Sequence, residues 1–282
     1  MVYLKNEFLN LEINENGAEI VKAQNHKGED IIWIGDKNFW AEHSPVLFPT
    51  CGSVLEDKYT YKGKVYPMQK HGFAKRSVFD VEGCTDTSAV FLLKSNEETK
   101  KIYPFDFELR VKYTIIDKKV KVDYVIDNKT DGEMLFSIGS HEGYMCGAFE
   151  DCVLEFDSEG SLKSCKLTGP YLNGETESIA KKCRLLPLGT KDFWAYDLIF
   201  KDITFKALTV KNKKGEKIVR TEFDGFPNLL IWSLPNAPYI CVEAWHGLPD
   251  YTDHDGSFEN KAGLIKLGMG ETKRLTHSFE IY

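Results

Sequence analysis

Along residues 109–126 apolar side chains recur with a period of two against a mostly polar set, and this limits the folds open to the chain. The alternation stops at Asp117-Lys118-Lys119 and then resumes. Its apolar positions are Leu109, Val111, Tyr113 and Ile115, then Val120, Val122, Tyr124 and Ile126. Successive side chains of a strand point to opposite faces of a sheet, so the pattern predicts an antiparallel hairpin with one buried face.

Short runs of the same kind recur along most of the chain. Turn signals separate many of them, for example at residues 14–17, 212–215 and 224–227. The runs cover residues 8–14, 18–24, 30–34, 59–66, 88–94, 132–140, 151–157, 203–211, 216–223, 228–233, 239–245 and 273–281. Many short strands with few helical stretches favour an all-β fold, a large antiparallel β-sandwich. Because no change of composition marks a boundary, we expect residues 1–282 to form a single domain; two smaller β domains are the alternative.

Composition argues against several classes of protein. Lys and Arg number 36 against 43 Asp and Glu, a net charge of −7, and the positive charges are scattered, which argues against a nucleic-acid partner. No run approaches the roughly 18 apolar residues of a membrane span, and no signal-peptide pattern opens the chain. Seven cysteines without a C-x-x-C pair fit reduced thiols. We therefore expect a cytoplasmic protein with no membrane partner and no metal site.

The first segment that could carry chemistry is residues 137–144, which contain His141. In a strand leading into it, Ser137, Gly139 and His141 would share a small, partly polar face that leaves room beside the imidazole. With an ordinary pKa of about 6.5, a histidine there can donate or accept a proton near neutral pH. The alternative is a hydrogen-bonded histidine at a strand end.

The second segment is residues 238–247, where Glu243 shares a strand face with Tyr239, Cys241 and Trp245. A carboxylate buried among aromatic rings has a raised pKa, which suits a general base. Rings beside a carboxylate also suit a sugar, whose C–H face stacks on them while its hydroxyls need acceptors. The alternative is a glutamate at an exposed sheet edge.

The third segment is residues 66–76, in which Gly72 permits a tight turn after His71 and lets that ring project into a cleft. The alternative is a solvated loop histidine. The five tryptophans are expected mainly in the core, and Trp245 is the only one that the sequence places beside a catalytic candidate. They are Trp33, Trp40, Trp194, Trp232 and Trp245.

Four motifs, taken in order, resemble the aldose 1-epimerase (galactose mutarotase) family, and most of all its LacX-like branch. They are Ser44 to Pro49, His71-Gly72-Phe73-Ala74, Ser137 to His141, and Glu243-Ala244-Trp245-His246-Gly247. The resemblance runs from the Trp33 and Trp40 region to residues 261–271 and covers most of the chain. Each motif alone is modest, but four in the right order are specific.

The resemblance implies a single β-supersandwich domain and an isomerase acting on a small-molecule sugar. Glu243 would be the general base that removes the proton of the anomeric hydroxyl, and His141 the general acid that protonates the ring oxygen. His71, Asp197 and Trp245 would contact the sugar. No metal or organic cofactor is implied, because two positioned proton carriers can each contribute about 10²–10⁴-fold. We expect a monomer or a homodimer.

The chain also departs from the family pattern. Ser53 stands where members commonly have an arginine, Glu142-Gly143-Tyr144 replaces a proline and an aromatic after the histidine, and Lys75 replaces an arginine. These departures leave the preferred sugar open. Two alternatives therefore stand beside a free-hexose mutarotase: a hexose-6-phosphate mutarotase, and a non-catalytic carbohydrate-binding protein on the same scaffold. A glycoside hydrolase is less favoured, because it usually needs two carboxylates facing the bond.

Overall fold

The computed structural model describes residues 1–189 and 197–282, and most of them lie in antiparallel strands. One short helix, α1 (Glu97–Ile102), and four 3-10 turns, η1 (Leu55–Asp57), η2 (Ala74–Arg76), η3 (Phe149–Asp151) and η5 (Phe258–Asn260), are the helical elements of this described part. The strands are β1 (Val2–Lys5), β2 (Leu9–Asn14), β3 (Glu19–Asn25), β4 (Lys58–Tyr61), β5 (Lys64–Pro67), β6 (Asp80–Cys84), β7 (Ser88–Lys94), β8 (Phe107–Ile116), β9 (Lys119–Asn128), β10 (Met134–Phe136), β11 (Glu142–Met145), β12 (Val153–Thr168), β13 (Tyr171–Pro187), β14 (Asp197–Phe200), β15 (Ala207–Lys211), β16 (Lys217–Glu222), β17 (Asn228–Trp232), β18 (Tyr239–Trp245), β19 (Ile265–Leu267) and β20 (Thr272–Ile281).

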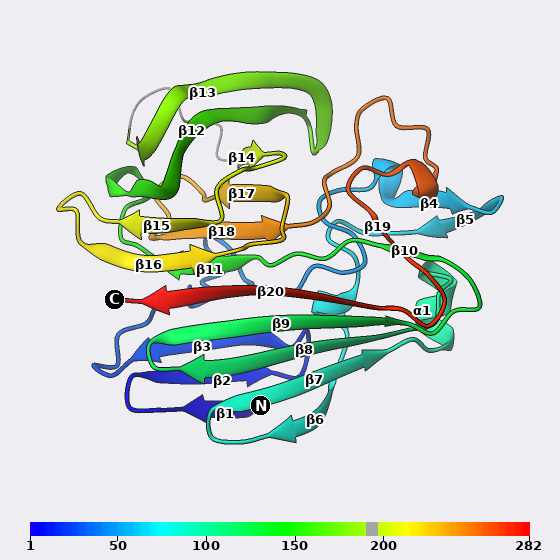
Figure 1. The fold of residues 1–282 in the computed structure, drawn as a ribbon, viewed down its shortest axis with the longest axis horizontal. Helices are drawn as coiled ribbons and strands as arrows, with labels where there is room; N and C mark the ends of the chain where they lie inside the picture. Colours follow the sequence, from blue (N-terminus) through cyan, green and yellow to red (C-terminus); the bar gives the residue numbers. More distant parts are fainter. Residues whose placement is uncertain (190–196) are drawn as a thin grey trace.

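Thirteen of the described strands form one large sheet, with the order β11-β18-β17-β14-β12-β15-β16-β20-β9-β8-β7-β6, and β13 pairs with β12 beside this path. Smaller sheets are β1-β2-β3, β10-β19 and β4-β5. Figure 1 shows β20, near the C-terminus, running between the β16 side and the β9 side of the large sheet. The all-β, antiparallel fold class is confirmed. A single domain over residues 1–282 stays a prediction.

The hairpin predicted from the alternation is confirmed as β8 and β9. Their registers pair Phe107 with Asn128 and Ile116 with Lys119, and Asp117 adopts the left-handed backbone (φ +52°) that Asp tolerates in tight turns. The alternating apolar side chains are buried, as the period of two requires. The three-stranded sheet packs on this region, where the Tyr113 hydroxyl donates to the Ala18 carbonyl at 2.7 Å.

Several predicted runs differ in detail from the strands observed. Residues 30–34 form only isolated bridges, through Asp30 and Ile32, and residues 59–66 are two strands joined at Lys62-Gly63, where both backbones have positive φ. The predicted 132–140 strand ends at Phe136, because residues 137–141 leave it to dock against β18. Short or polar strands such as β6, β11, β14 and the largely exposed β13 lack a clear alternation and were missed.

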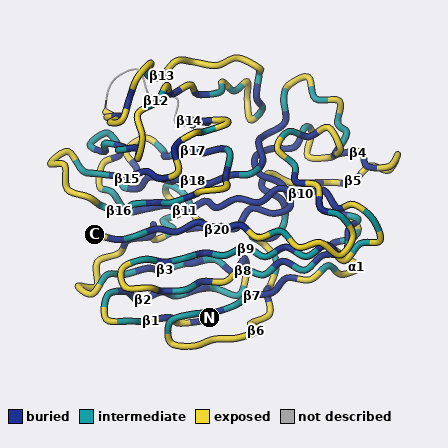
Figure 2. Tube along the Cα trace, in the orientation of Figure 1, coloured by how far each residue is buried: buried dark blue, intermediate teal, exposed yellow. Residues whose placement is uncertain are grey.

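Buried residues concentrate where the large sheet is covered on both faces. Figure 2 shows the central strands β11, β17 and β18 largely buried, whereas the β12–β13 arch is mostly intermediate or exposed. Strand β18 is buried at every position. Side chains on both of its faces are therefore largely removed from bulk water, and a polar side chain there needs a partner or a function. Among the described residues there is no helix long and apolar enough to cross a membrane.

Candidate active site

The site is built on β18, a strand whose two neighbours hold it on both edges. Strand β17 pairs with it so that Leu230 lies opposite Glu243, and β11 pairs so that Glu142 lies opposite Val242. Within β18, Tyr239, Cys241, Glu243 and Trp245 occupy alternate positions and so share one face. The alternative of an exposed sheet edge is wrong for Glu243, whose side chain has no exposed surface.

The segment before β11 carries His141 over this row. The Ser140 amide donates to the Ala244 carbonyl at 3.0 Å, the Ala244 amide donates to the Ser140 hydroxyl at 3.2 Å, and His246 N–H donates to Ile138. Gly139 is required at this crossing, since a Cβ there would lie 2.8 Å from Cδ1 of the Trp245 ring. The backbone thus fixes His141 above β18 without a regular strand.

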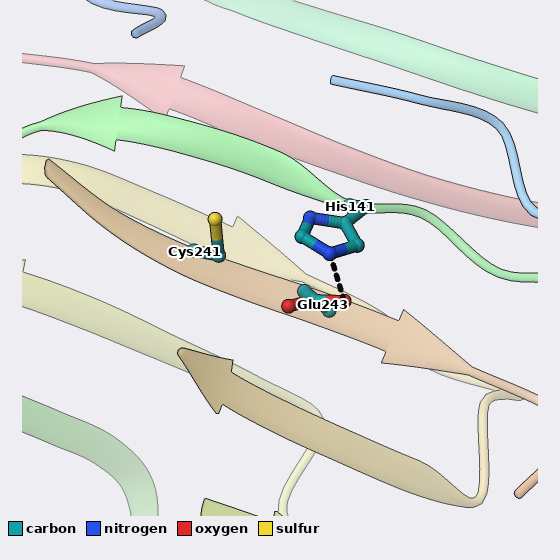
Figure 3. Close-up of side chains that lie close together, drawn as sticks. All are labelled: His141, Cys241 and Glu243. Carbon is teal, nitrogen blue, oxygen red and sulfur yellow. Dashed lines mark ion pairs between the residues drawn. The ribbon is translucent and has the colours of Figure 1, made fainter. Parts of the chain in front are cut away.

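His141 and Glu243 meet as a buried pair. His141 Nε2 lies 3.3 Å from Glu243 Oε2, and the dashed line in Figure 3 marks this contact. The Trp245 indole N–H donates to the same Oε2 at 3.1 Å and also to the Ser140 carbonyl at 3.2 Å. His141 Nδ1 and Glu243 Oε1 are buried and have no hydrogen-bond partner among the described residues. The pair therefore keeps unused hydrogen-bonding capacity.

Burial controls where the proton of this pair resides. It raises the pKa of Glu243 well above its ordinary value, an effect that nearby Lys70 opposes. It also lowers the pKa of His141 to about 3, with help from the positive charges of Lys75 and Lys70. The pair therefore favours a protonated Glu243 carboxyl beside a neutral His141 imidazole. Transfer of this proton from Glu243 Oε2 to His141 Nε2 converts the pair into a carboxylate and an imidazolium.

His71 stands beside the pair from the η2 side. Its ring centroid lies 5.5 Å from that of His141 and 5.4 Å from that of Trp245. The Gly52 amide donates to His71 Nδ1 at 3.1 Å, so a neutral His71 carries its proton on Nε2. Burial lowers the pKa of His71 well below its ordinary value, which keeps the ring neutral. The reading of His71 as a solvated loop residue is wrong, because the residue is buried.

The pair, His71 and Trp245 line a cavity of about 310 Å³. Asp197 at the start of β14 also lines it, so all five predicted site residues are brought together. Partial burial raises the pKa of Asp197, and Lys70 opposes this rise. The remaining lining residues are Trp40, Glu42, Lys70, Lys75, Leu230 and Trp232. The Lys75 ammonium lies 2.9 Å from Glu42 Oε2.

Two tryptophans at the cavity correct the expectation that Trp245 alone adjoins a catalytic candidate. The ring centroids of Trp40 and Trp232 lie 4.8 and 5.7 Å from that of His141. Trp33 is a core residue as expected, and Trp194 lies outside the described residues. Trp232 could have been found by pairing the predicted runs 228–233 and 239–245, since it lies opposite Cys241 in that register. Glu42 carried no comparable signal.

The positions that depart from the family pattern lie close to the site. Ser53 lines a hollow of about 250 Å³ that shares Lys70, Asp197, Leu230 and Trp245 with the cavity. Glu142 is buried and faces β20, where its Oε1 lies 2.7 Å from His277 Nε2. Glu142 is therefore not itself a lining residue, whereas the space beside Ser53 extends the cavity.

Comparison with known proteins shows the same architecture along the whole chain. A sequence profile described as Aldose 1-epimerase matches residues 1–280. Protein LacX, plasmid, of Lactococcus lactis subsp. lactis is 29% identical over 99% of both chains. The galactose mutarotase related enzyme of Lactobacillus acidophilus has a TM-score of 0.92 at 30% identity, covering 99% of this chain and 96% of that one. A galactose mutarotase-like protein of Lactobacillus casei has a TM-score of 0.93 at 30% identity over the full length of both.

Proposed function

Because this chain belongs to the aldose 1-epimerase family, we propose that it is a mutarotase that interconverts the α and β anomers of a free aldose. The observation that carries the proposal is the His141–Glu243 pair, 3.3 Å apart, in the lining of a cavity large enough for a monosaccharide. A hemiacetal carries its ring oxygen and its anomeric hydroxyl on one carbon, so two adjacent proton carriers can serve both oxygens at once.

In this mechanism Glu243 acts as the general base and His141 as the general acid. The Glu243 carboxylate takes the proton of the anomeric hydroxyl while the His141 imidazolium protonates the ring oxygen. The bond between the anomeric carbon and the ring oxygen breaks, and an open-chain aldehyde forms. Rotation about the C1–C2 bond presents the other face, and reversal of both transfers closes the opposite anomer. No proton leaves the site overall.

The charges of the site support this assignment. Ring opening leaves Glu243 protonated and His141 neutral, which is the state that burial favours. Before ring opening, the carboxylate form of Glu243 is stabilised by the Trp245 N–H and by the nearby charge of Lys70. The protonation state that follows ring opening is thus the favoured one, so the site would offset part of the cost of forming the open-chain intermediate.

The remaining lining residues would hold the sugar. His71 can donate from Nε2, Asp197 can accept from a hydroxyl, and the Trp245 ring offers an apolar edge. Two lysines and three carboxyl groups line the cavity, and Lys75 is paired with Glu42. This balance favours a neutral sugar over a phosphorylated one. A phosphate is bound best by side chains such as arginine, which donate two parallel hydrogen bonds and are not already paired with a carboxylate. A cytoplasmic location and action as a monomer or homodimer stay predictions.

Polarimetry of freshly dissolved α-glucose and α-galactose tests the proposal. We expect the protein to accelerate the approach to anomeric equilibrium, and Glu243→Gln to lower this rate about 10²–10⁴-fold, because it removes the base but keeps the shape. Glu133→Gln, at an exposed residue, is the matched control and should keep full activity.

Three outcomes would change the assignment. No acceleration with any of a panel of free aldoses would refute the proposal. Calorimetry that shows sugar binding without anomer exchange would instead support a non-catalytic binding protein. Strong competition by a hexose 6-phosphate, with faster exchange of that substrate, would favour the phosphorylated class.

A further inference from the structure

The catalytic pair has a third neighbour whose chemistry the mutarotase mechanism leaves unused. Cys241 precedes Glu243 by two residues on β18, so both side chains rise from the same face of the strand. Figure 3 shows the Cys241 sulfur, the Glu243 carboxyl and the His141 ring on one side of β18. One ligand atom from each residue lies within 4.8 Å of the other two. Nitrogen, sulfur and oxygen donors thus converge on one small volume.

Two side chains of this cluster, His141 and Glu243, each keep one buried polar atom that no group in the described part of the chain satisfies. Glu243 Oε1 and His141 Nδ1 are buried without a hydrogen-bond partner among the described residues, and Glu243 has no exposed side-chain surface. Cys241 is fully buried against Trp33, Ala237 and Tyr239. Buried polar atoms without partners are rare and call for a ligand or a function. Both side chains that carry these atoms also line the cavity.

The spacing of the cluster fits a tetrahedral cation. Zinc bonds of about 2.0 Å to nitrogen or oxygen and 2.3 Å to sulfur place tetrahedral ligand atoms roughly 3.3–3.7 Å apart. His141 Nε2 and Glu243 Oε2 are already at 3.3 Å. The distances from the Cys241 sulfur to the ligand atoms of His141 and Glu243 are at most 4.8 Å. The sulfur therefore needs to move no more than about 1 Å toward them to complete the site. Three protein ligands leave a fourth tetrahedral position for water.

We propose that His141, Cys241 and Glu243 form a binding site for a thiophilic divalent cation such as Zn²⁺, and that its occupation inhibits the enzyme. The thiol and the carboxyl release their protons to solvent when the cation binds, and no electron transfer is involved. Inhibition follows because the cation takes both proton carriers as ligands. The inhibitory part rests on the proposed mutarotase function, whereas the site itself does not.

Binding of Co²⁺ to the full-length protein tests the site without any activity measurement. We expect one Co²⁺ per chain, with the near-ultraviolet thiolate-to-cobalt band and the intense visible bands of a tetrahedral site, and displacement by Zn²⁺. Cys241→Ser and Cys241→Ala should each lose the thiolate band. Cys84→Ser, which removes an exposed thiol, is the control and should retain it. Absence of the band in the native protein, or its persistence in both folded Cys241 variants, would overturn the site.

Mutarotation in the presence of Zn²⁺ tests the inhibition separately. We expect Zn²⁺ to inhibit the native protein, and Cys241→Ser to need at least about 10-fold more Zn²⁺ for the same effect, since loss of a ligand weakens metal binding at least as much as loss of an outer contact. Equal sensitivity of both proteins would overturn the inhibition. A protein with the cobalt bands but without activity on any aldose would overturn the mutarotase function and leave the site standing.

Discussion

The buried pair Asp250–Lys261 offers the sharpest test of how the site is supported. Asp250 Oδ1 accepts from the Lys261 ammonium at 2.7 Å, and Oδ2 accepts from the Leu55 amide at 2.8 Å. Both side chains of the pair are only 1% exposed. The Asp250 amide also donates to the Ser53 carbonyl, next to Gly52, whose amide donates to His71. The pair therefore fixes the backbone that holds His71.

Asp250→Asn should destabilise the protein severely. Both carboxylate oxygens accept hydrogen bonds, so the new NH₂ group must face a donor whichever way the amide is turned. The Lys261 ammonium would also lose its counter-charge in a site where burial already lowers its pKa. Breaking a buried ion pair from one side costs about 3–5 kcal/mol, which corresponds to a fall in melting temperature of roughly 6–20 °C for a chain of this size.

Urea unfolding measures this cost, with two further proteins as references. Asp250→Asn combined with Lys261→Met should recover part of the loss, because replacing both charges avoids an unpaired one. Glu98→Gln disrupts a highly exposed pair with Lys101 and should change the free energy of unfolding by less than about 0.5 kcal/mol. A cost below about 1 kcal/mol for Asp250→Asn would refute the reasoning.

Two further predictions concern His141 and Gly72. Because the pKa of His141 is about 3 in the folded chain and near 6.5 when unfolded, its contribution to stability is complete above pH 6.5 and falls with pH below it. His141→Gln should make the acid-side loss in urea unfolding shallower by up to about 1.4 kcal/mol per pH unit, and equal slopes would contradict this. Gly72→Ala places a Cβ 2.2 Å from the Phe48 carbonyl oxygen at φ +72°, so it should cost clearly more than Gly63→Ala, where φ is +76° and the space is open. Equal melting temperatures for the two glycine variants would show that the close approach of residue 72 to the Phe48 carbonyl does not require glycine.

The sequence predicted which residues share a face, but, apart from the β8–β9 hairpin, not which strands become neighbours. The alternation around Glu243 correctly grouped it with Cys241 and Trp245, since a period of two follows from strand geometry alone. Trp232 escaped notice as a cavity residue because it reaches the site through pairing of β17 with β18, and periodicity carries no information on pairing partners.

The supporting polar contacts were harder still to predict. Lys261 and Asp250 are charged residues in irregular segments, which usually indicate solvent exposure, yet both are buried. Glu142 and His277 are 135 positions apart and meet only because β11 and β20 approach each other in the folded sheet. Long-range contacts of this kind depend on the complete topology, so a local pattern cannot reveal them.

In the proposed mechanism, the position of the His141–Glu243 pair explains why few polar groups are needed. A mutarotase returns its proton carriers to their starting state within one turnover, because each group that gains a proton on ring opening loses it on closure. The pair can therefore be closed off from bulk solvent, with Glu243 fully buried and His141 11% exposed at the side chain. Burial strengthens each charge interaction by lowering the local dielectric, and the single Trp245 N–H is then a substantial stabiliser of the carboxylate. A divalent cation bound by His141, Cys241 and Glu243, as proposed above, would replace the shared proton and so stop this cycle.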